Sequence, residues 1–160
     1  MTFAFNRAPF PATLLRRLRR HDALRQMLSE TLLQPQHLIA PVFVLPGTKQ
    51  RQAIASMPGI ERLSVDLLLK HAETLLALGV TTLALFPVTP QSDKSLDASA
   101  AWRPDGLVQT TLRTLKKELP ELVLISDVAL DPYTSQGQER LTEEAGNVRN
   151  APTDAMLNTQ

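Results

Sequence analysis

Cysteine is absent from the 160 residues of this sequence. Disulfide bonds, thiolate zinc sites and a thiol nucleophile are therefore excluded, and a reducing compartment such as the cytoplasm is the expected location. No uninterrupted apolar run approaches the roughly 18 residues of a membrane-spanning helix, so we expect no membrane partner. The net charge of +1 supplies no general attraction to nucleic acid. With 43% hydrophobic and 21% charged residues, the composition is that of a globular domain.

Acidic residues are also missing from the first 21 positions, where arginine is frequent. The arginines of this stretch are Arg7, Arg16, Arg17, Arg19 and Arg20. Four interpretations compete: an organelle transit peptide, a contact for phosphate groups, an arm that lies on a partner subunit, and a solvated basic tail. Pro9 and Pro11 break an amphipathic helix, which argues against a transit peptide. No aromatic residue stands among Arg16, Arg17, Arg19 and Arg20 to stack on a base, which argues against a nucleic-acid contact. We expect residues 1–20 to form an arm with few contacts to its own domain.

After the arm, short apolar runs alternate with amphipathic helical patterns. The spacing of leucines predicts helices over 22–33, 64–79 and 106–119, and the apolar runs predict strands over 38–44, 80–86 and 122–127. Ser64 is expected to be an N-cap and Gly79 the residue that ends the second helix. Pro41 has no N–H and is expected to face an edge or a bulge, while residues 89–105 form a long loop. Strands that alternate with helices predict an α/β fold of parallel βα units.

Carboxylates gather after the last of these strands. Asp127 falls at the carboxyl end of the strand, which is the edge of a parallel sheet where ligands bind, and Asp131 and Glu139 follow it. Three carboxylates can hold a hard cation through oxygen or bind the ammonium group of a substrate. The alternative is that they are ordinary turn or helix-cap residues.

Several motifs, taken in order, resemble those of the porphobilinogen synthase family, also called delta-aminolevulinic acid dehydratase. The resemblance covers the chain up to about residue 135. The motifs are Leu15-Arg16-Arg17-Leu18-Arg19-Arg20, Pro41-Val42-Phe43-Val44, Ser56-Met57-Pro58-Gly59, Leu85-Phe86-Pro87-Val88, Pro104-Asp105-Gly106-Leu107 and Asp127-Val128-Ala129-Leu130-Asp131-Pro132-Tyr133-Thr134-Ser135.

The resemblance implies a fold, an assembly and a reaction. Members fold as a (β/α)8 barrel, so residues 21–135 would be the first part of a barrel, and an N-terminal arm embraces a neighbour in a homo-octamer. They condense two 5-aminolevulinate molecules to porphobilinogen with loss of water, in tetrapyrrole and haem biosynthesis. Residues 136–160 depart from the family's pattern and are expected to be a divergent, poorly packed tail.

The resemblance also implies roles for individual residues. Asp127 matches a catalytic position, and Ala129, Asp131 and Glu139 stand where zinc-dependent members carry three cysteines. The resemblance is compatible with magnesium, bound with substrate near Asp131 and Glu139, whereas the lack of cysteine argues against zinc.

Both Schiff-base lysines of the family belong to motifs beyond residue 160. The lysines of this chain are Lys49, Lys70, Lys94, Lys116 and Lys117, and none falls at the carboxyl end of an expected strand. We therefore expect the 160 residues alone to be inactive. Two alternatives stay open: a non-catalytic fragment or paralogue that associates with full-length subunits, and a small carboxylate-lined binding module.

Overall fold

The computed structural model describes residues 8–9, 11–12 and 16–137. Predictions that concern Leu15, Glu139 and the segment 138–160 lie outside the described residues. The chain divides into two compact units, residues 1–34 and 35–160.

The first unit contains a 3-10 turn, Arg17–Arg19, and one short helix, α1, Asp22–Met27. The predicted helix over 22–33 is therefore too long: it ends at Met27, and Leu28 is its C-cap. None of the described residues in this unit is buried, and Leu18 is 47% exposed. A short helix needs an apolar surface to pack on, and the described residues of this unit bury no side chain that could provide one.

The second unit is built on a five-stranded sheet in the order β2-β3-β1-β4-β5. Its strands are β1 (Ile39–Leu45), β2 (Arg51–Ala53), β3 (Glu61–Ser64), β4 (Thr82–Pro87) and β5 (Val123–Ser126). β2 and β3 are antiparallel, whereas β3, β1, β4 and β5 are mutually parallel. The three predicted strands and the parallel pairing of the last two are confirmed. β2 and β3 were not predicted, because they are short and mostly polar.

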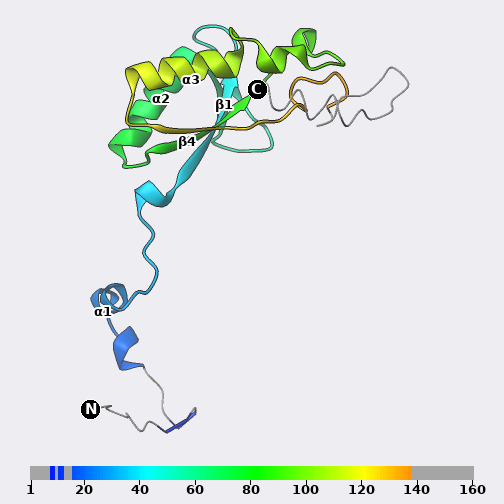
Figure 1. The fold of residues 1–160 in the computed structure, drawn as a ribbon. Coiled ribbons are helices and arrows are strands. Elements are labelled where there is room, and N and C mark those ends of the chain that lie inside the picture. Colours follow the sequence, from blue (N-terminus) through cyan, green and yellow to red (C-terminus); the bar gives the residue numbers. More distant parts are fainter. Residues whose placement is uncertain (1–7, 10, 13–15, 138–160) are drawn as a thin grey trace, which may run out of the picture. The chain divides into compact units, whose positions relative to one another are not determined.

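Two helices, α2 (Val65–Ala77) and α3 (Leu107–Glu118), lie side by side on one face of the sheet (Figure 1). Alternate residues of β1 and β4 point to this face and are buried there against the helices. The main core consists of Val42, Val44, Leu63, Leu68, Ala72, Leu83, Leu85, Leu115 and Leu122. This core holds both helices against the sheet, so the unit has two layers, one of helices and one of strands.

The sheet's other face is apolar as well, but more open. On it the rings of Phe43 and Phe86 lie 5.8 Å apart between centroids, in register with one another. Ile39 and Val123 are more than half exposed, and Ile125 is 42% exposed.

β1 lies inside the sheet, so Pro41 is not on an edge strand. The pairing with β3 begins only at Phe43, however, whereas the pairing with β4 runs from Ile39 to Val44. At Pro41, β1 therefore has no partner strand on its β3 side in the described part of the chain. A residue without an N–H is tolerated at such a position, because no ladder hydrogen bond is needed there.

The ends of α2 follow the sequence closely. Gly79, at φ +86°, donates to the carbonyl of Leu76 and Val80 donates to that of Leu75, both at 2.9 Å. These two bonds form a Schellman motif, which needs a residue with positive φ. Ser64 is the N-cap as predicted, but its hydroxyl donates to the carboxylate of Asp66 at 2.6 Å instead of capping the helix.

Candidate functional site

Asp127 directly follows β5, whose last residue, Ser126, pairs with Leu85 of β4. Its predicted position at the carboxyl end of a parallel strand is confirmed. The residue is exposed. It also lines a small cavity of about 50 Å³ against α3, shared with Gln109, whose amide oxygen is buried without a hydrogen-bond partner among the described residues.

Asp131 lies on the loop beyond β5, as predicted, and is half-buried. The loop folds on itself here: Tyr133 and Thr134 donate their amides to the carbonyl of Leu130 at 2.9 and 3.0 Å. Leu130 is fully buried, and the hydroxyl of Thr134 donates to the carbonyl of Asp131 at 3.4 Å. Hydrogen bonds within the loop therefore fix the backbone around Asp131.

A second segment, the β4–α3 connection, fixes this loop. Ser95 and Thr134 form an isolated parallel bridge, in which Ser95 donates to the carbonyl of Tyr133 and Ser135 donates to that of Ser95, both at 3.1 Å. Beside the bridge a second core cluster joins both segments; it consists of Ala98, Ala101, Leu130 and Tyr133. The expected loop over 89–105 is thus ordered, with two 3-10 turns at Gln91–Asp93 and Ser99–Trp102. The sequence alone does not indicate a role for Ser95, because nothing in the order of residues pairs it with Thr134.

The described residues contain no group of three or more His, Asp or Glu side chains that could hold a metal ion. Asp127 and Asp131 are only two carboxylates, and Glu139 lies outside the described residues. The described donors do not make up a magnesium site by themselves.

All five lysines lie in the described part of the chain, and four of them are exposed. The ammonium of Lys116 donates to the carbonyls of Pro120 and Leu122, at the opposite end of α3 from the candidate site. Lys94 is half-buried and directly precedes Ser95. It is therefore the one lysine among the described residues whose backbone adjoins the loop of Asp131.

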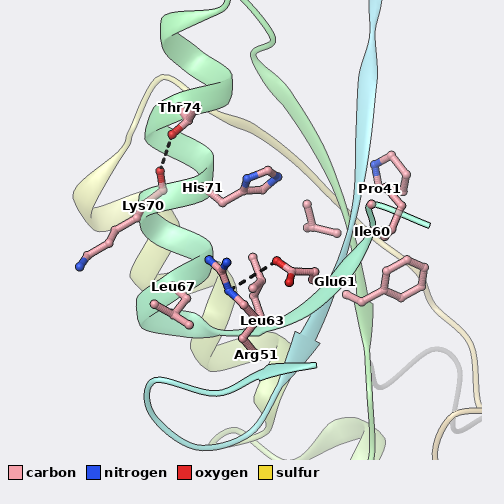
Figure 2. Close-up of a pocket in the computed structure, with 12 residues that line it drawn as sticks. Pro41, Arg51, Ile60, Glu61, Leu63, Leu67, Lys70, His71 and Thr74 are labelled. Carbon is pink, nitrogen blue, oxygen red and sulfur yellow. Dashed lines mark hydrogen bonds and ion pairs between the residues drawn. The ribbon is translucent and has the colours of Figure 1, made fainter. Parts of the chain in front are cut away.

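The cavity drawn in Figure 2 lies on the opposite flank of the sheet from β5, between β3 and α2. It has a volume of about 300 Å³ and contains neither Asp127 nor Asp131. Arg51 and Glu61 form an ion pair of 3.4 Å across it, and Lys70 and His71 line its helical side. His71 is exposed, and among the described residues it belongs to no group of three or more His, Asp or Glu side chains that could hold a metal ion.

A larger cavity, of about 450 Å³, lies at the carboxyl ends of β1 and β4, where Gly47, Thr89 and Tyr133 line it. Burial raises the pKa of Tyr133 to about 12. The sequence alone does not predict this cavity, because its walls come from segments far apart in the chain.

The mostly parallel sheet and the helices on one of its faces place this chain in the class of α/β proteins, and Asp127 lies at the edge of the sheet where ligands of such proteins generally bind. The delta-aminolevulinic acid dehydratase family model matches residues 12–160, and this chain belongs to that family.

Curated relatives are similar over most of this chain. It is 42% identical over 142 residues to delta-aminolevulinic acid dehydratase of Bradyrhizobium diazoefficiens, which covers 89% of this chain and 40% of the relative. A second relative, from Chlamydia pneumoniae, is 42% identical over 124 residues, which cover 78% of this chain and 37% of the relative. The chain thus spans about two fifths of the length of these relatives.

A solved structure shows the same fold. The crystal structure of delta-aminolevulinic acid dehydratase from Toxoplasma gondii ME49, in complex with the reaction product porphobilinogen, superposes with a TM-score of 0.85 at 37% sequence identity. The match covers 92% of this chain and 42% of that one. No helix among the described residues is long and apolar enough to cross a membrane. The cytoplasmic location stays a prediction, and relatives from Physcomitrium patens and Selaginella martensii are named chloroplastic.

Proposed function

We propose that this chain supplies the first part of a porphobilinogen synthase, which condenses two molecules of 5-aminolevulinate to porphobilinogen with loss of water. The observation that carries the proposal is the place of Asp127, just after a parallel strand in a chain of this family. The product named in the Toxoplasma gondii structure supports the same reaction.

We propose further that residues 21–135 are the beginning of a (β/α)8 barrel. Parallel β1, β4 and β5, with α2 and α3 on one face, support this arrangement. The open apolar face of Ile39, Val123 and Ile125 would then line the inside of the closed barrel. The arm, with its exposed Leu18, would lie on a neighbouring subunit of a homo-octamer.

In this proposal the carboxylate of Asp127 binds the substrate ammonium or moves a proton at the reacting carbon, since it is exposed at the ligand-binding edge. Asp131 and Glu139 add oxygen donors for substrate or for magnesium. Covalent catalysis through an imine needs a lysine amine that is neutral at working pH, which requires burial or a cationic neighbour. The four exposed lysines lack the burial that this chemistry needs.

The test has two parts: borohydride trapping of an imine on the isolated chain, and co-expression of the chain with the missing carboxyl-terminal part of a relative. The purified chain is treated with 5-aminolevulinate and borohydride, followed by intact mass and a colour assay for porphobilinogen. We expect no adduct and no product, with or without magnesium. An adduct that disappears in Lys94→Gln, together with product, would contradict the expected inactivity.

The same chain is then expressed together with the remaining carboxyl-terminal part of the Bradyrhizobium diazoefficiens relative. We expect product formation that Asp127→Asn reduces by at least about a hundredfold, within the range for loss of an acid–base group. Glu118→Gln, an exposed carboxylate on α3, is the control and should have no effect. A folded complex without product would contradict the proposal and favour the alternative of a non-catalytic paralogue.

A further inference from the structure

The β4–α3 connection contains a tight turn, residues 95–99, in which one residue has an unusual backbone conformation. Ala98 has a φ of +52° and is fully buried, in the same core cluster as Leu130 and Tyr133. A residue with a Cβ rarely adopts this left-handed conformation, which persists only where surrounding contacts impose it. The contacts that impose it here therefore decide the shape of the turn.

The side chain of Asp97 closes this turn. Its carboxylate accepts hydrogen bonds from the Ser95 hydroxyl at 2.6 Å and from the Ser99 amide at 3.3 Å, and the Ser95 hydroxyl accepts from the same amide at 3.2 Å. The bond from the Ser95 hydroxyl, followed by that from the Ser99 amide, holds the pKa of Asp97 below its ordinary value of 3.8. The acceptor is therefore a charged carboxylate at neutral pH, and bonds to a charged acceptor are stronger than bonds between neutral groups.

The same turn is bonded to the loop that carries Asp131. The amide of Ser95 donates to the carbonyl of Tyr133, and the carbonyl of Ser95 accepts from the amide of Ser135, both at 3.1 Å. Ser95 is thus bonded to Asp97 through its side chain and to the loop through its backbone. A change in the turn therefore stretches or breaks the bonds that fix the loop.

We infer that Asp97 is a positioning residue of the candidate site, which fixes the turn and, through Ser95, the place of Asp131 at the ligand-binding edge. This inference rests on the proposed function, in which Asp131 adds an oxygen donor for substrate. Asp97 lines none of the three cavities described above, so it acts through the backbone and not on the reacting groups. Its loss should weaken substrate binding more than it slows the chemical step.

The first measurement is hydrogen exchange in the full chain at the amide of Ser135. Asp97→Ala should speed this exchange about fivefold, which is the cost of an ordinary hydrogen bond. Asp97→Asn keeps an oxygen acceptor for Ser95 and should speed the exchange less than about twofold. The amide of Val123, which donates to Thr81 within the sheet, should exchange at the same rate in all variants.

The matched control is Asp93→Ala, in the same connection. Asp93 is exposed, and among the described residues its side chain bonds only that of Ser92. This substitution should leave the exchange of Ser135 unchanged. An equal effect of Asp93→Ala and Asp97→Ala, or no effect of Asp97→Ala, would overturn the inference.

The second measurement is the steady-state kinetics of the chain co-expressed with the carboxyl-terminal part of the Bradyrhizobium diazoefficiens relative. Asp97→Ala should raise KM for 5-aminolevulinate about fivefold and change kcat less than about twofold, and Asp97→Asn should restore KM. An unchanged KM would mean that Asp97 serves only the stability of the fold, and would overturn the inference. If the wild-type complex forms no product, the proposed function fails, and the exchange of Ser135 alone decides whether Asp97 holds the loop.

Discussion

Ser95 and Thr134, 39 positions apart in the sequence, form a parallel bridge in which the N–H and the carbonyl of Ser95 are both bonded to the segment around Thr134. This bridge ties the β4–α3 connection to the loop that carries Asp131. Two segments therefore hold the candidate site in place. A substitution that loosens either segment should also weaken the hydrogen bonds of the other.

The first prediction concerns Leu130, which is fully buried beside this bridge. Leu130→Ala should lower the free energy for opening the loop by about 2 kcal/mol or more, because it leaves a cavity in a small cluster. Hydrogen exchange at the amides of Ser95 and Ser135 measures this opening. Leu96→Ala, in the same connection but 38% exposed, is the control, and an equal effect there would contradict the prediction.

The second prediction concerns Gly79, which has a φ of +86°. Gly79→Ala should lower the free energy of unfolding by about 1–2 kcal/mol, because a Cβ is strained in this left-handed conformation. An added Cβ would also lie 3.2 Å from the Cβ of Pro35. Gly59, at φ +84°, has nothing within 4 Å of such an atom. Urea unfolding should therefore show a smaller loss for Gly59→Ala than for Gly79→Ala, and the reverse order would contradict this account.

The third prediction concerns acid stability. The hydrogen bond from the Ser64 hydroxyl, followed by that from the Lys49 amide, holds the pKa of Asp66 below its ordinary value of 3.8. A group whose pKa is lower in the folded state stabilises the fold above its unfolded pKa, and this stabilisation is lost as the pH falls from 3.8 through the folded pKa. Asp66→Asn should thus reduce the pH dependence of urea unfolding in that window.

The control for Asp66 is Glu73, an exposed carboxylate on the same helix with no hydrogen bond among the described residues. Glu73→Gln should change the acid dependence less than Asp66→Asn does. Asp97 and Asp105 also have lowered pKa values, so part of the acid dependence should persist in Asp66→Asn. Identical pH profiles for wild type and Asp66→Asn would refute the assignment.

The fourth prediction concerns alkaline pH. Tyr133 is the only tyrosine in the sequence, and burial raises its pKa to about 12. The unfolded chain loses this proton near pH 10 while the folded chain retains it, so stability should fall as the pH rises from 10 to about 12. Absorbance titration of phenolate measures the pKa directly, and Tyr133→Phe should lose this part of the pH dependence. A midpoint near 10 in the folded protein would show that the ring is not buried.

Local patterns in the sequence determined much of the framework. The apolar run before Asp127 is long enough to identify a strand, and a strand's end is a local property, so the place of Asp127 was predicted correctly. Gly79 was predicted as the end of α2 because only a residue that tolerates positive φ fits there. The helix from Asp22 was predicted too long, since leucine spacing alone does not tell whether there is a surface for the leucines to pack on.

Only the tertiary structure decided the rest. β2 and β3 are short and polar, and they are strands because β1 offers them a partner, which no local pattern shows. Thr89, Asp93 and Tyr133 line one cavity, although they come from two separate connections. Contacts between such distant segments depend on the register of the sheet and on the packing of α3. The sequence by itself therefore determined the strand that Asp127 follows, whereas the cavity lined by Thr89, Asp93 and Tyr133 exists only once the chain has folded.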